Sequence, residues 1–280
     1  MTASLPFRAP SPDLAARAEF CRDLVRSAGV LAREGFVRRL GSQIGMKGPQ
    51  DFLTETDALV EHHIKARIAE AFPTDGFLGE ETGATHWGDQ LWVVDPIDGT
   101  ANFARQIPHF CISIAFVLGG TTVLGAIYNP VLDELYFAQR GNGAQMNGRP
   151  IHVADTASHD AACVELGWST RVPQAQYLDA LTAILSHGAN VRRAASGALA
   201  LAYVSDGRSD GYAELHMQPW DCLAGLLLVE EAGGVVAPFL TRGGLERGGA
   251  VLAATPAIAA AMSEATGIAL VDALESPALA

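Results

Sequence analysis

The sequence predicts a layered protein in which an α+β first half and an α/β second half pack into one body. Two helical periodicities followed by several short apolar strands indicate the first half, and strands that alternate with helices after Pro150 indicate the second. The 280 residues, 49 % of them hydrophobic, can bury a sizeable core. We therefore expect a disordered tail at residues 1–12 and two halves at residues 13–150 and 151–280.

Each expected element has its own local signal. Apolar residues at helical spacing predict two helices in the first half, the first with Asp13 as its N-cap, and a wholly apolar run before Asp95 predicts a buried strand. The expected helices cover residues 13–37, 56–72, 173–187, 197–206, 220–232 and 256–266. The expected strands cover residues 91–94, 112–118, 121–128, 134–138, 212–215 and 251–254, with a tight hairpin at Gly119-Gly120.

Charge and composition narrow the possible partners. With 31 acidic and 19 basic residues the formal charge is -12, which argues against a protein that coats nucleic acid. The four cysteines are scattered, which argues against a disulfide framework or a zinc site and favours a reducing cytosol. No signal peptide is visible, and no apolar run approaches the roughly 20 residues that span a bilayer. We expect a cytoplasmic protein that binds neither nucleic acid nor membrane.

The most informative motif is Asp95-Pro-Ile-Asp98-Gly-Thr100, at the end of the apolar strand. The carboxyl end of a buried strand is the usual ligand edge of a sheet, and we expect a turn through Pro96 and Gly99 to fold Asp98 back toward Asp95. Two carboxylates held this close raise each other's pKa unless divalent cations neutralise them. A helix that begins at Thr100 would offer free N–H groups to an anion. The motif therefore predicts Mg²⁺ beside a phosphate, although an isolated motif of this kind could also be only a turn.

The other acidic groups have ordinary interpretations as well as catalytic ones. Asp57 could be an N-cap that satisfies free N–H groups at the start of the second helix. Glu80 and Glu81 could be a solvated pair, although Gly79 before them would allow the backbone to pass close to another group. Asp221 could simply complement the dipole of the helix that it begins. Only these three segments together with the Asp95–Asp98 motif argue for a catalytic metal site.

Together these segments resemble the inositol monophosphatase superfamily of magnesium-dependent, lithium-sensitive phosphatases. The resemblance implies a sugar-phosphatase-like sandwich with layers in the order α-β-α-β-α, two to three Mg²⁺ ions per active site, and a homodimer. It spans about residues 13–268, and the matching segments occur in the family's order. They are Lys47-Gly48 with Asp51 and Thr54-x-x-Asp57, Gly79-Glu80-Glu81, Asp95-Pro-Ile-Asp98-Gly-Thr100-x-Asn102-Phe103, Trp220-Asp221-x-x-Ala224-Gly225 and Glu231-Ala-Gly-Gly.

The resemblance also implies which residues hold the metals. Glu80, Asp95 and the carbonyl group of Ile97 would hold the first Mg²⁺ ion. Asp95, Asp98 and Asp221 would hold the second. Glu80 would also face a weakly bound third ion that is mostly hydrated.

Further roles follow from the same resemblance. Thr100, hydrogen-bonded toward Asp57, would position the attacking water and help to deprotonate it. The backbone amides of Gly99 and Thr100 would hold phosphate oxygens. Lys47 would belong to a mobile loop over the metals, and Glu214 would hydrogen-bond substrate hydroxyls.

Two departures from the family pattern concern the substrate side. Ala194-Ala195-Ser196-Gly197 stands where many members carry a Gly-Thr or Gly-Ser pair, and we place Ser196 among the substrate-binding residues. Trp168 makes the segment that approaches the substrate bulkier, or else it packs in the core. The preference for a leaving group therefore stays open.

The sequence predicts Mg²⁺-dependent hydrolysis of a small phosphomonoester by an activated water. Asn102-Phe103 and the later Ile107-Pro-His-Phe110 look most like the inositol branch, so myo-inositol 1-phosphate is the expected substrate. Histidinol phosphate is the alternative, because Glu214 could pair with an ammonium group. An alternative of another class is a regulatory or partner-binding protein that keeps the fold. The four acidic ligands that the chain retains argue against this alternative.

Overall fold

The structure, a computed structural model, describes residues 12–38, 45–48, 51–53 and 55–271. The helices are α1 Pro12–Arg38, α2 Glu55–Ala71, α3 Thr100–Ala104, α4 Gln174–Ser186, α5 Gly197–Ser205, α6 Pro219–Glu231, α7 Gly244–Arg247 and α8 Pro256–Thr266, with 3₁₀ turns η1 His159–Ala161 and η2 Leu240–Arg242. The strands are β1 Gly45–Gly48, β2 Asp51–Leu53, β3 Gly76–Gly79, β4 Gly83–His86, β5 Gln90–Asp98, β6 Cys111–Leu118, β7 Thr121–Asn129, β8 Glu134–Gln139, β9 Ala144–Met146, β10 Arg149–Pro150, β11 Cys163–Leu166, β12 Asn190–Arg192, β13 Gly211–Met217, β14 Val235–Val236 and β15 Gly249–Ala254.

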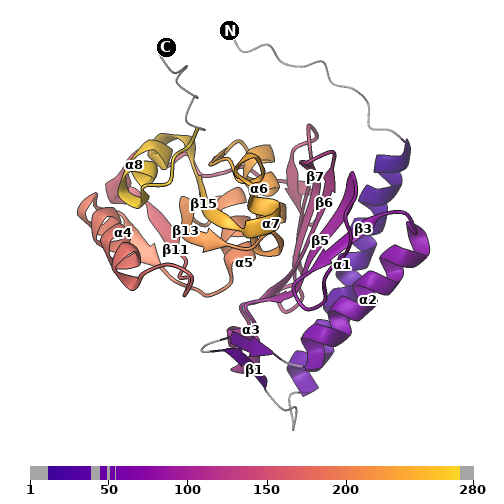
Figure 1. The fold of residues 1–280 in the computed structure, drawn as a ribbon. Coiled ribbons are helices and arrows are strands. Elements are labelled where there is room, and N and C mark those ends of the chain that lie inside the picture. Colours follow the sequence, from indigo (N-terminus) through magenta and orange to yellow (C-terminus); the bar gives the residue numbers. More distant parts are fainter. Residues whose placement is uncertain (1–11, 39–44, 49–50, 54, 272–280) are drawn as a thin grey trace, which may run out of the picture.

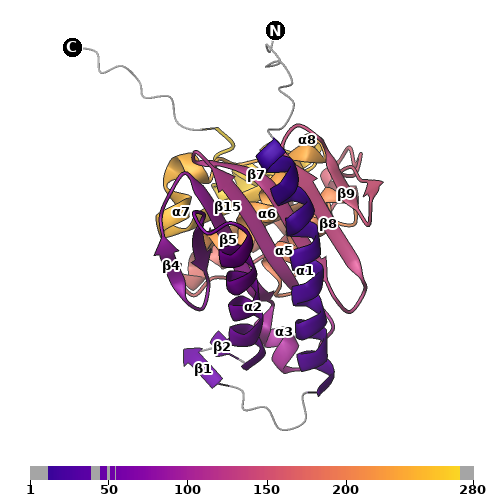
Figure 2. The ribbon, with the colours of Figure 1, turned by 90° about the vertical axis from the view of Figure 1, so that its right-hand side faces the viewer.

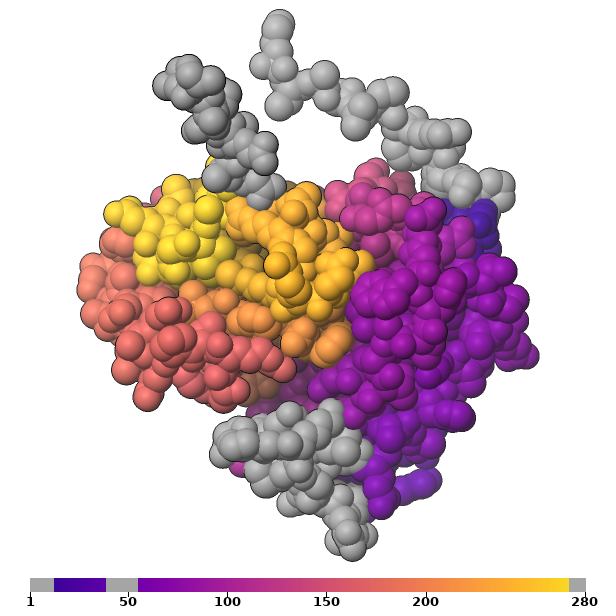
Figure 3. All heavy atoms as spheres, viewed as in Figure 1, coloured from indigo at the N-terminus to yellow at the C-terminus, as the bar shows by residue number. Residues whose placement is uncertain are grey.

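Helical layers and sheets alternate through the molecule (Figure 1). Helices α1 and α2 cover one face of an eight-stranded sheet, and α5 and α6 lie between that sheet and a five-stranded sheet. Helices α4 and α8 cover the far face of the second sheet. The expected α-β-α-β-α order of layers is therefore confirmed. The halves are in direct contact in the space-filling view (Figure 3).

The large sheet has the order β10-β9-β8-β7-β6-β5-β3-β4, with β5 inside it. Side chains alternate between the two faces of a strand, and β5 is buried on both. Trp92 and Val94 pack toward α1 and α2, which cross that face side by side in Figure 2. Leu91 and Val93 pack toward α5 and α6. This two-sided burial explains why the strand is wholly apolar up to Asp95.

The smaller sheet has the order β12-β11-β13-β15-β14 and carries the second half. Strand β11 runs parallel to both of its neighbours, whereas β13 and β15 are antiparallel. The connections from β12 through α5 to β13, and from β13 into α6, place the N-termini of both helices at the seam with the large sheet. The sandwich thereby brings helix N-termini from one half to the end of β5 in the other.

Most expected elements are present, with small changes at their ends. The expected helix at residues 256–266 coincides with α8, and the strand expected at residues 91–94 extends to Asp98. Asp13 is not the N-cap of α1, because the helix already includes Pro12; Asp13 instead forms an ion pair with Arg17 in the first turns. Residues 1–11 of the expected tail lie outside the described residues. None of the described helices is long and apolar enough to cross a membrane.

Close packing of β7 against α6 depends on Gly125. A Cβ atom at this position would lie 2.7 Å from the carbonyl oxygen of Ala224, a backbone atom that cannot move aside independently. We predict that Gly125→Ala lowers the free energy of unfolding by about 2 kcal/mol, measured by denaturant unfolding. Gly88→Ala is the control, since a Cβ there would meet no atom closer than 3.5 Å. Equal unfolding midpoints for the two variants would contradict the claim that the packing of β7 against α6 requires a glycine at position 125.

Candidate active site

Glu80 and Asp95 lie side by side, Glu80 directly after β3 and Asp95 on the neighbouring strand β5. Strands β3 and β5 are parallel with Gly79 opposite Val94, so the next residue of each strand lies at the same edge of the sheet. The backbone N–H of Glu80 donates to the carbonyl of Val94 at 3.2 Å. Val93 faces the α5–α6 layer, and Asp95, two residues further on, faces the same way. The sheet thus aims Glu80 and Asp95 at the seam between the halves.

A β-bulge, rather than the expected turn, brings Asp98 to the same side as Asp95. Residues three apart on a regular strand point to opposite faces. Between Asp95, opposite Ser113, and Asp98, opposite Cys111, strand β5 has one residue more than β6. This extra residue restores a common face, as bulges do when they redirect a side chain. The N–H of Ile97 donates to Asp95 Oδ1 at 2.9 Å and fixes the bulged segment.

Asp98 occupies the N-terminus of α5, a helix from the other half of the chain. The Ser196 hydroxyl donates to Asp98 Oδ2 at 2.5 Å, and the N–H of Ala198 donates to the same oxygen at 2.9 Å. The N–H of Gly197 lies 3.3 Å from Oδ1. These are donors that a helix leaves unpaired at its start, and the helix dipole favours a negative charge there. Asp98 therefore links the two halves through charge-assisted hydrogen bonds.

Asp221 comes from the first turn of α6. Its Oδ2 accepts a hydrogen bond from the N–H of Gln218 at 3.1 Å, as in a capping box. One carboxylate oxygen from each of Asp95, Asp98 and Asp221 lies within 4.8 Å of the others. Asp95 and Asp98 are only 2 % and 8 % exposed. Four of the predicted metal ligands therefore come together from three distant segments, since Glu80 lies beside Asp95.

Electrostatics favour a cation at this cluster. Burial raises the pKa of Asp95 well above its usual value, and the charges of Glu80, Asp98 and Asp221 raise it further. Burial likewise raises the pKa of Asp98 and of Asp221, against hydrogen bonds that lower it. In the described part of the chain, no lysine or arginine forms an ion pair with Asp95, Asp98 or Asp221. Hard carboxylate oxygens without a protein cation fit Mg²⁺.

Thr100 and Asp57 meet beside the carboxylates. Asp57 is the third residue of α2 rather than its N-cap, and it is fully buried. Thr100 Oγ1 lies 3.3 Å from Asp57 Oδ1 and 2.9 Å from the carbonyl oxygen of Ile97, so its proton has two acceptors. Gly99 has φ of 96°, a left-handed conformation that allows α3 to start directly after β5. The structure brings these residues together, and their catalytic and phosphate-binding roles remain predictions.

Glu61 is a supporting residue that the sequence analysis did not identify. It is 1 % exposed on α2, and its two carboxylate oxygens accept hydrogen bonds of 2.8 Å from the N–H groups of Glu81 and Thr82. The chain that carries Glu80 is thereby fixed. Gly79 leaves room for this carboxylate, because a Cβ atom there would meet Glu61 Oε2 at 2.5 Å. The sequence did contain a signal for this role of Glu61. It is an acidic residue on the apolar face of a predicted helix, and a glycine precedes Glu80.

A cavity of about 260 Å³ lies at the seam and is bordered by Asp98, Asp221 and Glu214. Trp168 also borders it and packs edge-to-face on Tyr177 with ring centroids 5.1 Å apart, but it is only partly buried, so packing in the core is not confirmed and its approach to the substrate stays a prediction. Ser196 borders the cavity too, but its hydroxyl donates to Asp98. The substrate-binding role of Ser196 and of Glu214 remains a prediction.

The expected mobile loop is only partly described. The backbone of Lys47 lies in β1, which pairs with β2, and the side chains of Lys47 and Asp51 lie outside the described residues. Thr54 is outside them altogether. The role predicted for Lys47 therefore stays a prediction.

The sequence profile of the inositol monophosphatase family matches residues 13–273. The chain is 36 % identical over 241 residues to the Nus factor SuhB of Escherichia coli strain K12, covering 85 % of this chain and 90 % of that relative. It is 43 % identical over 198 residues to an inositol-1-monophosphatase of Mesorhizobium japonicum, covering 69 % of this chain and 74 % of the relative. The crystal structure of suhB from Bartonella henselae is similar with a TM-score of 0.83 and 32 % identity, over 90 % of this chain and 98 % of that one.

The charge cluster predicts how metal binding depends on pH. The pKa values of Asp95, Asp98 and Asp221 in the folded protein are raised above the unfolded value of about 4. These groups therefore contribute their full stability to the folded state below about pH 4. That contribution is lost as the pH rises through their folded-state pKa values. Mg²⁺ binds the ionised form and offsets this loss. We predict that millimolar Mg²⁺ raises the melting temperature more at about pH 8 than at about pH 5.

The control for this measurement is Asp98→Asn, which removes one of the mutually repelling charges. In this variant the Mg²⁺-induced rise should be smaller at the higher pH. Equal Mg²⁺-induced rises at both pH values in the unsubstituted protein would contradict a metal site at these carboxylates.

Ala195 is strained at the edge of the site. Its φ of 60° lies in the left-handed region, where a Cβ atom costs about 1 kcal/mol. We predict that Ala195→Gly raises the free energy of unfolding by about 0.5–1 kcal/mol, because the released strain exceeds the extra entropy of the unfolded glycine. Calorimetry measures the change, and Ala194→Gly, one position earlier, is the control that should destabilise. A lower melting temperature for Ala195→Gly would show that the position is not strained.

Proposed function

This chain belongs to the inositol monophosphatase family, and we propose that it hydrolyses the phosphomonoester of a small neutral polyol, with myo-inositol 1-phosphate as the favoured substrate. The family supports a phosphatase role. The observation that carries the proposal is the meeting of Asp95, Asp98 and Asp221 within 4.8 Å at the end of a cavity that also contains Glu214. Acidic ligands for cations and an acceptor for hydroxyls on the walls of one cavity suit a phosphorylated polyol.

The acidic residues would hold the Mg²⁺ ions. Glu80, Asp95 and the carbonyl of Ile97 would bind one ion, and Asp95 with Asp98 and Asp221 would bind another. When bound, Mg²⁺ would lower the pKa of the attacking water and offset the charge on the phosphate and the leaving oxygen. The residues themselves supply fixed positions, because Asp98 is anchored on α5 and Asp221 on α6. Such anchoring keeps the ligands in place without a cost of reorganisation during the reaction.

Thr100 and Asp57 would orient the nucleophile. A water that donates to Thr100 Oγ1 could pass its proton along the hydroxyl toward Asp57 Oδ1, which lies 3.3 Å away. The carboxylate is fully buried, so this acceptor is shielded from bulk water. Backbone N–H groups at Gly99 and Thr100 would hold the phosphate, as at other helix starts that follow a glycine.

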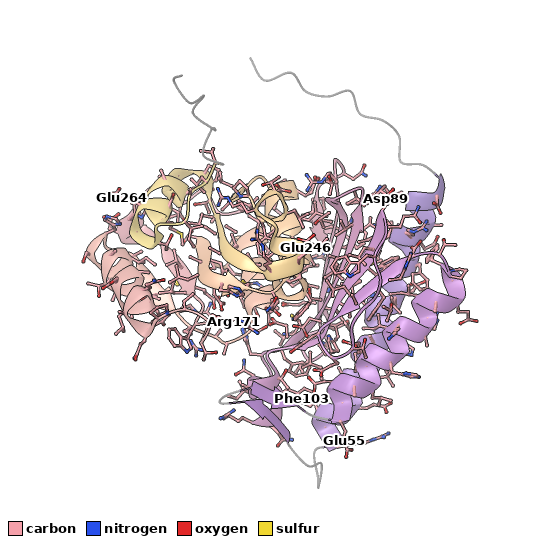
Figure 4. All side chains as sticks on the ribbon, in the orientation of Figure 1. Glu55, Asp89, Phe103, Arg171, Glu246 and Glu264 are labelled. Atoms are coloured by element: carbon pink, nitrogen blue, oxygen red, sulfur yellow. The ribbon has the colours of Figure 1, made fainter. Side chains whose placement is uncertain are left out.

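A neutral leaving group fits the surroundings of Glu214 better than a cationic one. Burial raises the pKa of the Glu214 carboxyl, whereas the charges of Arg193, which borders the same cavity, and of Arg171 act to lower it. Figure 4 labels Arg171 on the C-terminal half, beside the seam. These guanidinium groups would repel the ammonium group of histidinol phosphate, whereas they leave hydroxyl groups unaffected. This difference favours the polyol over the alternative substrate.

A second candidate function is the binding of a partner protein or complex. The name "Nus factor" of the Escherichia coli relative motivates it. The complete acidic cluster favours turnover, because a scaffold has no need of buried, mutually repelling carboxylates. Family resemblance also leads us to propose a cytoplasmic homodimer that uses two to three Mg²⁺ ions and is inhibited by lithium.

A phosphate-release assay across several esters tests the proposal. We predict the highest kcat/KM with myo-inositol 1-phosphate in the presence of Mg²⁺, and lower values with histidinol phosphate and with nucleoside monophosphates. Asp98→Asn should lower kcat at least about a hundredfold, because it removes a charged ligand. Asp179→Asn, an exposed acid on α4, is the matched control and should retain full activity. Faster turnover of histidinol phosphate, or full activity of Asp98→Asn, would refute the assignment.

A further inference from the structure

Tyr212 and Glu214 form a hydrogen-bonded pair on β13. The Tyr212 hydroxyl donates to Glu214 Oε2 at 2.5 Å. The two residues are two apart on the strand, so both side chains point to the same face, toward the cavity that they border. Tyr212 is 3 % exposed, whereas Glu214 is only partly buried. The tyrosine therefore lies behind the carboxylate, and the carboxylate lies nearer to a bound ester.

Two glycines leave the space that this pair occupies. A Cβ atom at Gly167, just after β11, would collide with both Glu214 Oε2 and the Tyr212 hydroxyl. A Cβ atom at Gly197, the first residue of α5, would lie 3.0 Å from the Tyr212 hydroxyl. The pair is thus enclosed by backbone from two elements, and a buried side chain enclosed in this way has few alternative rotamers. The hydroxyl of Tyr212 has a fixed position.

The groups around Glu214 shift its pKa in opposite directions. Burial, with Asp98 adding to it, raises the pKa of Glu214 to about 7, whereas the Tyr212 hydrogen bond and the charges of Arg193 and Arg171 lower it. Asp221, on α6, faces the same group. Removing the Tyr212 hydroxyl would therefore raise the pKa of Glu214 as well as release its side chain. Both changes weaken a carboxylate as an acceptor.

We propose that Tyr212 is a positioning residue that occupies one oxygen of Glu214 and directs the other, Oε1, to accept a hydrogen bond from a hydroxyl of the leaving group. The pair then selects phosphomonoesters that carry hydroxyl groups over those that carry none, since a buried acceptor left without a donor costs binding free energy. This inference rests on the proposed phosphatase function. Tyr212 acts through Glu214 and does not itself contact the ester.

The test compares two esters in the full-length, Mg²⁺-loaded protein. One is myo-inositol 1-phosphate, and the other is p-nitrophenyl phosphate, whose leaving group has no hydroxyl to donate to Glu214. We expect Tyr212→Phe to lower the ratio of kcat/KM between the first and second ester about tenfold, mainly through a higher KM for the inositol ester. In a Glu214→Ala background, Tyr212→Phe should not lower the ratio further, because the residue that it positions is absent.

Tyr136→Phe is the matched control. Tyr136 is also fully buried and donates to a carboxylate, Asp206, at 3.0 Å, but it lies on β8 and does not border the cavity. It should lower the melting temperature without changing the ratio. Equal losses with both esters in Tyr212→Phe, or a further fall in the ratio in the Glu214→Ala background, would overturn the inference alone. Failure of the unsubstituted protein to hydrolyse either ester would overturn the proposed function, and the inference with it.

Discussion

Three carboxylates within 4.8 Å of one another, those of Asp95 and Asp98 buried and that of Asp221 partly buried, are the constraint on which the rest of the structure depends. Burial and mutual repulsion both disfavour their ionised forms, so the fold must hold them together against a cost that only protonation or a cation removes. A bound divalent cation would remove this cost, because the ligands cannot spread apart to relieve it. Stability and metal affinity are therefore linked through the same side chains.

The sandwich meets this constraint with elements from both halves. Parallel pairing of β3 and β5 places Glu80 beside Asp95, and the bulge in β5 adds Asp98 to the same face. Helices α5 and α6 then bring their N-termini to the cluster, where unpaired N–H groups and the helix dipoles stabilise negative charge. Since Asp98 is bonded to α5, the halves are joined at the site itself, and a shift of one half against the other would separate the ligands.

The cavity at the seam is bordered by two groups of residues to which we assign different roles. The end of the cavity beside the carboxylates is built from short, tightly fixed segments, including the strained Ala195 and the left-handed Gly99. The cavity is also bordered by β13, with the Tyr212–Glu214 pair enclosed by Gly167 and by α5. In the proposed function, the charge of Arg193 would favour a neutral leaving group.

The sequence by itself determined the layered fold, most helices and strands, and the Asp95–Asp98 motif, because apolar periodicity and the residue types around Asp95 and Asp98 are local signals. The family resemblance, rather than any local signal, implied that Glu80 and Asp221 join them. It did not reveal that a bulge, rather than a turn, brings Asp98 beside Asp95, since strand register depends on the partner strand. The role of Glu61 emerged only from the tertiary structure, because its hydrogen-bond partner lies on another element. The Tyr212–Glu214 hydrogen bond also emerged only there, because it depends on which face of β13 is buried. Residue types fix which chemistry is available, whereas long-range packing decides which groups come within hydrogen-bonding distance.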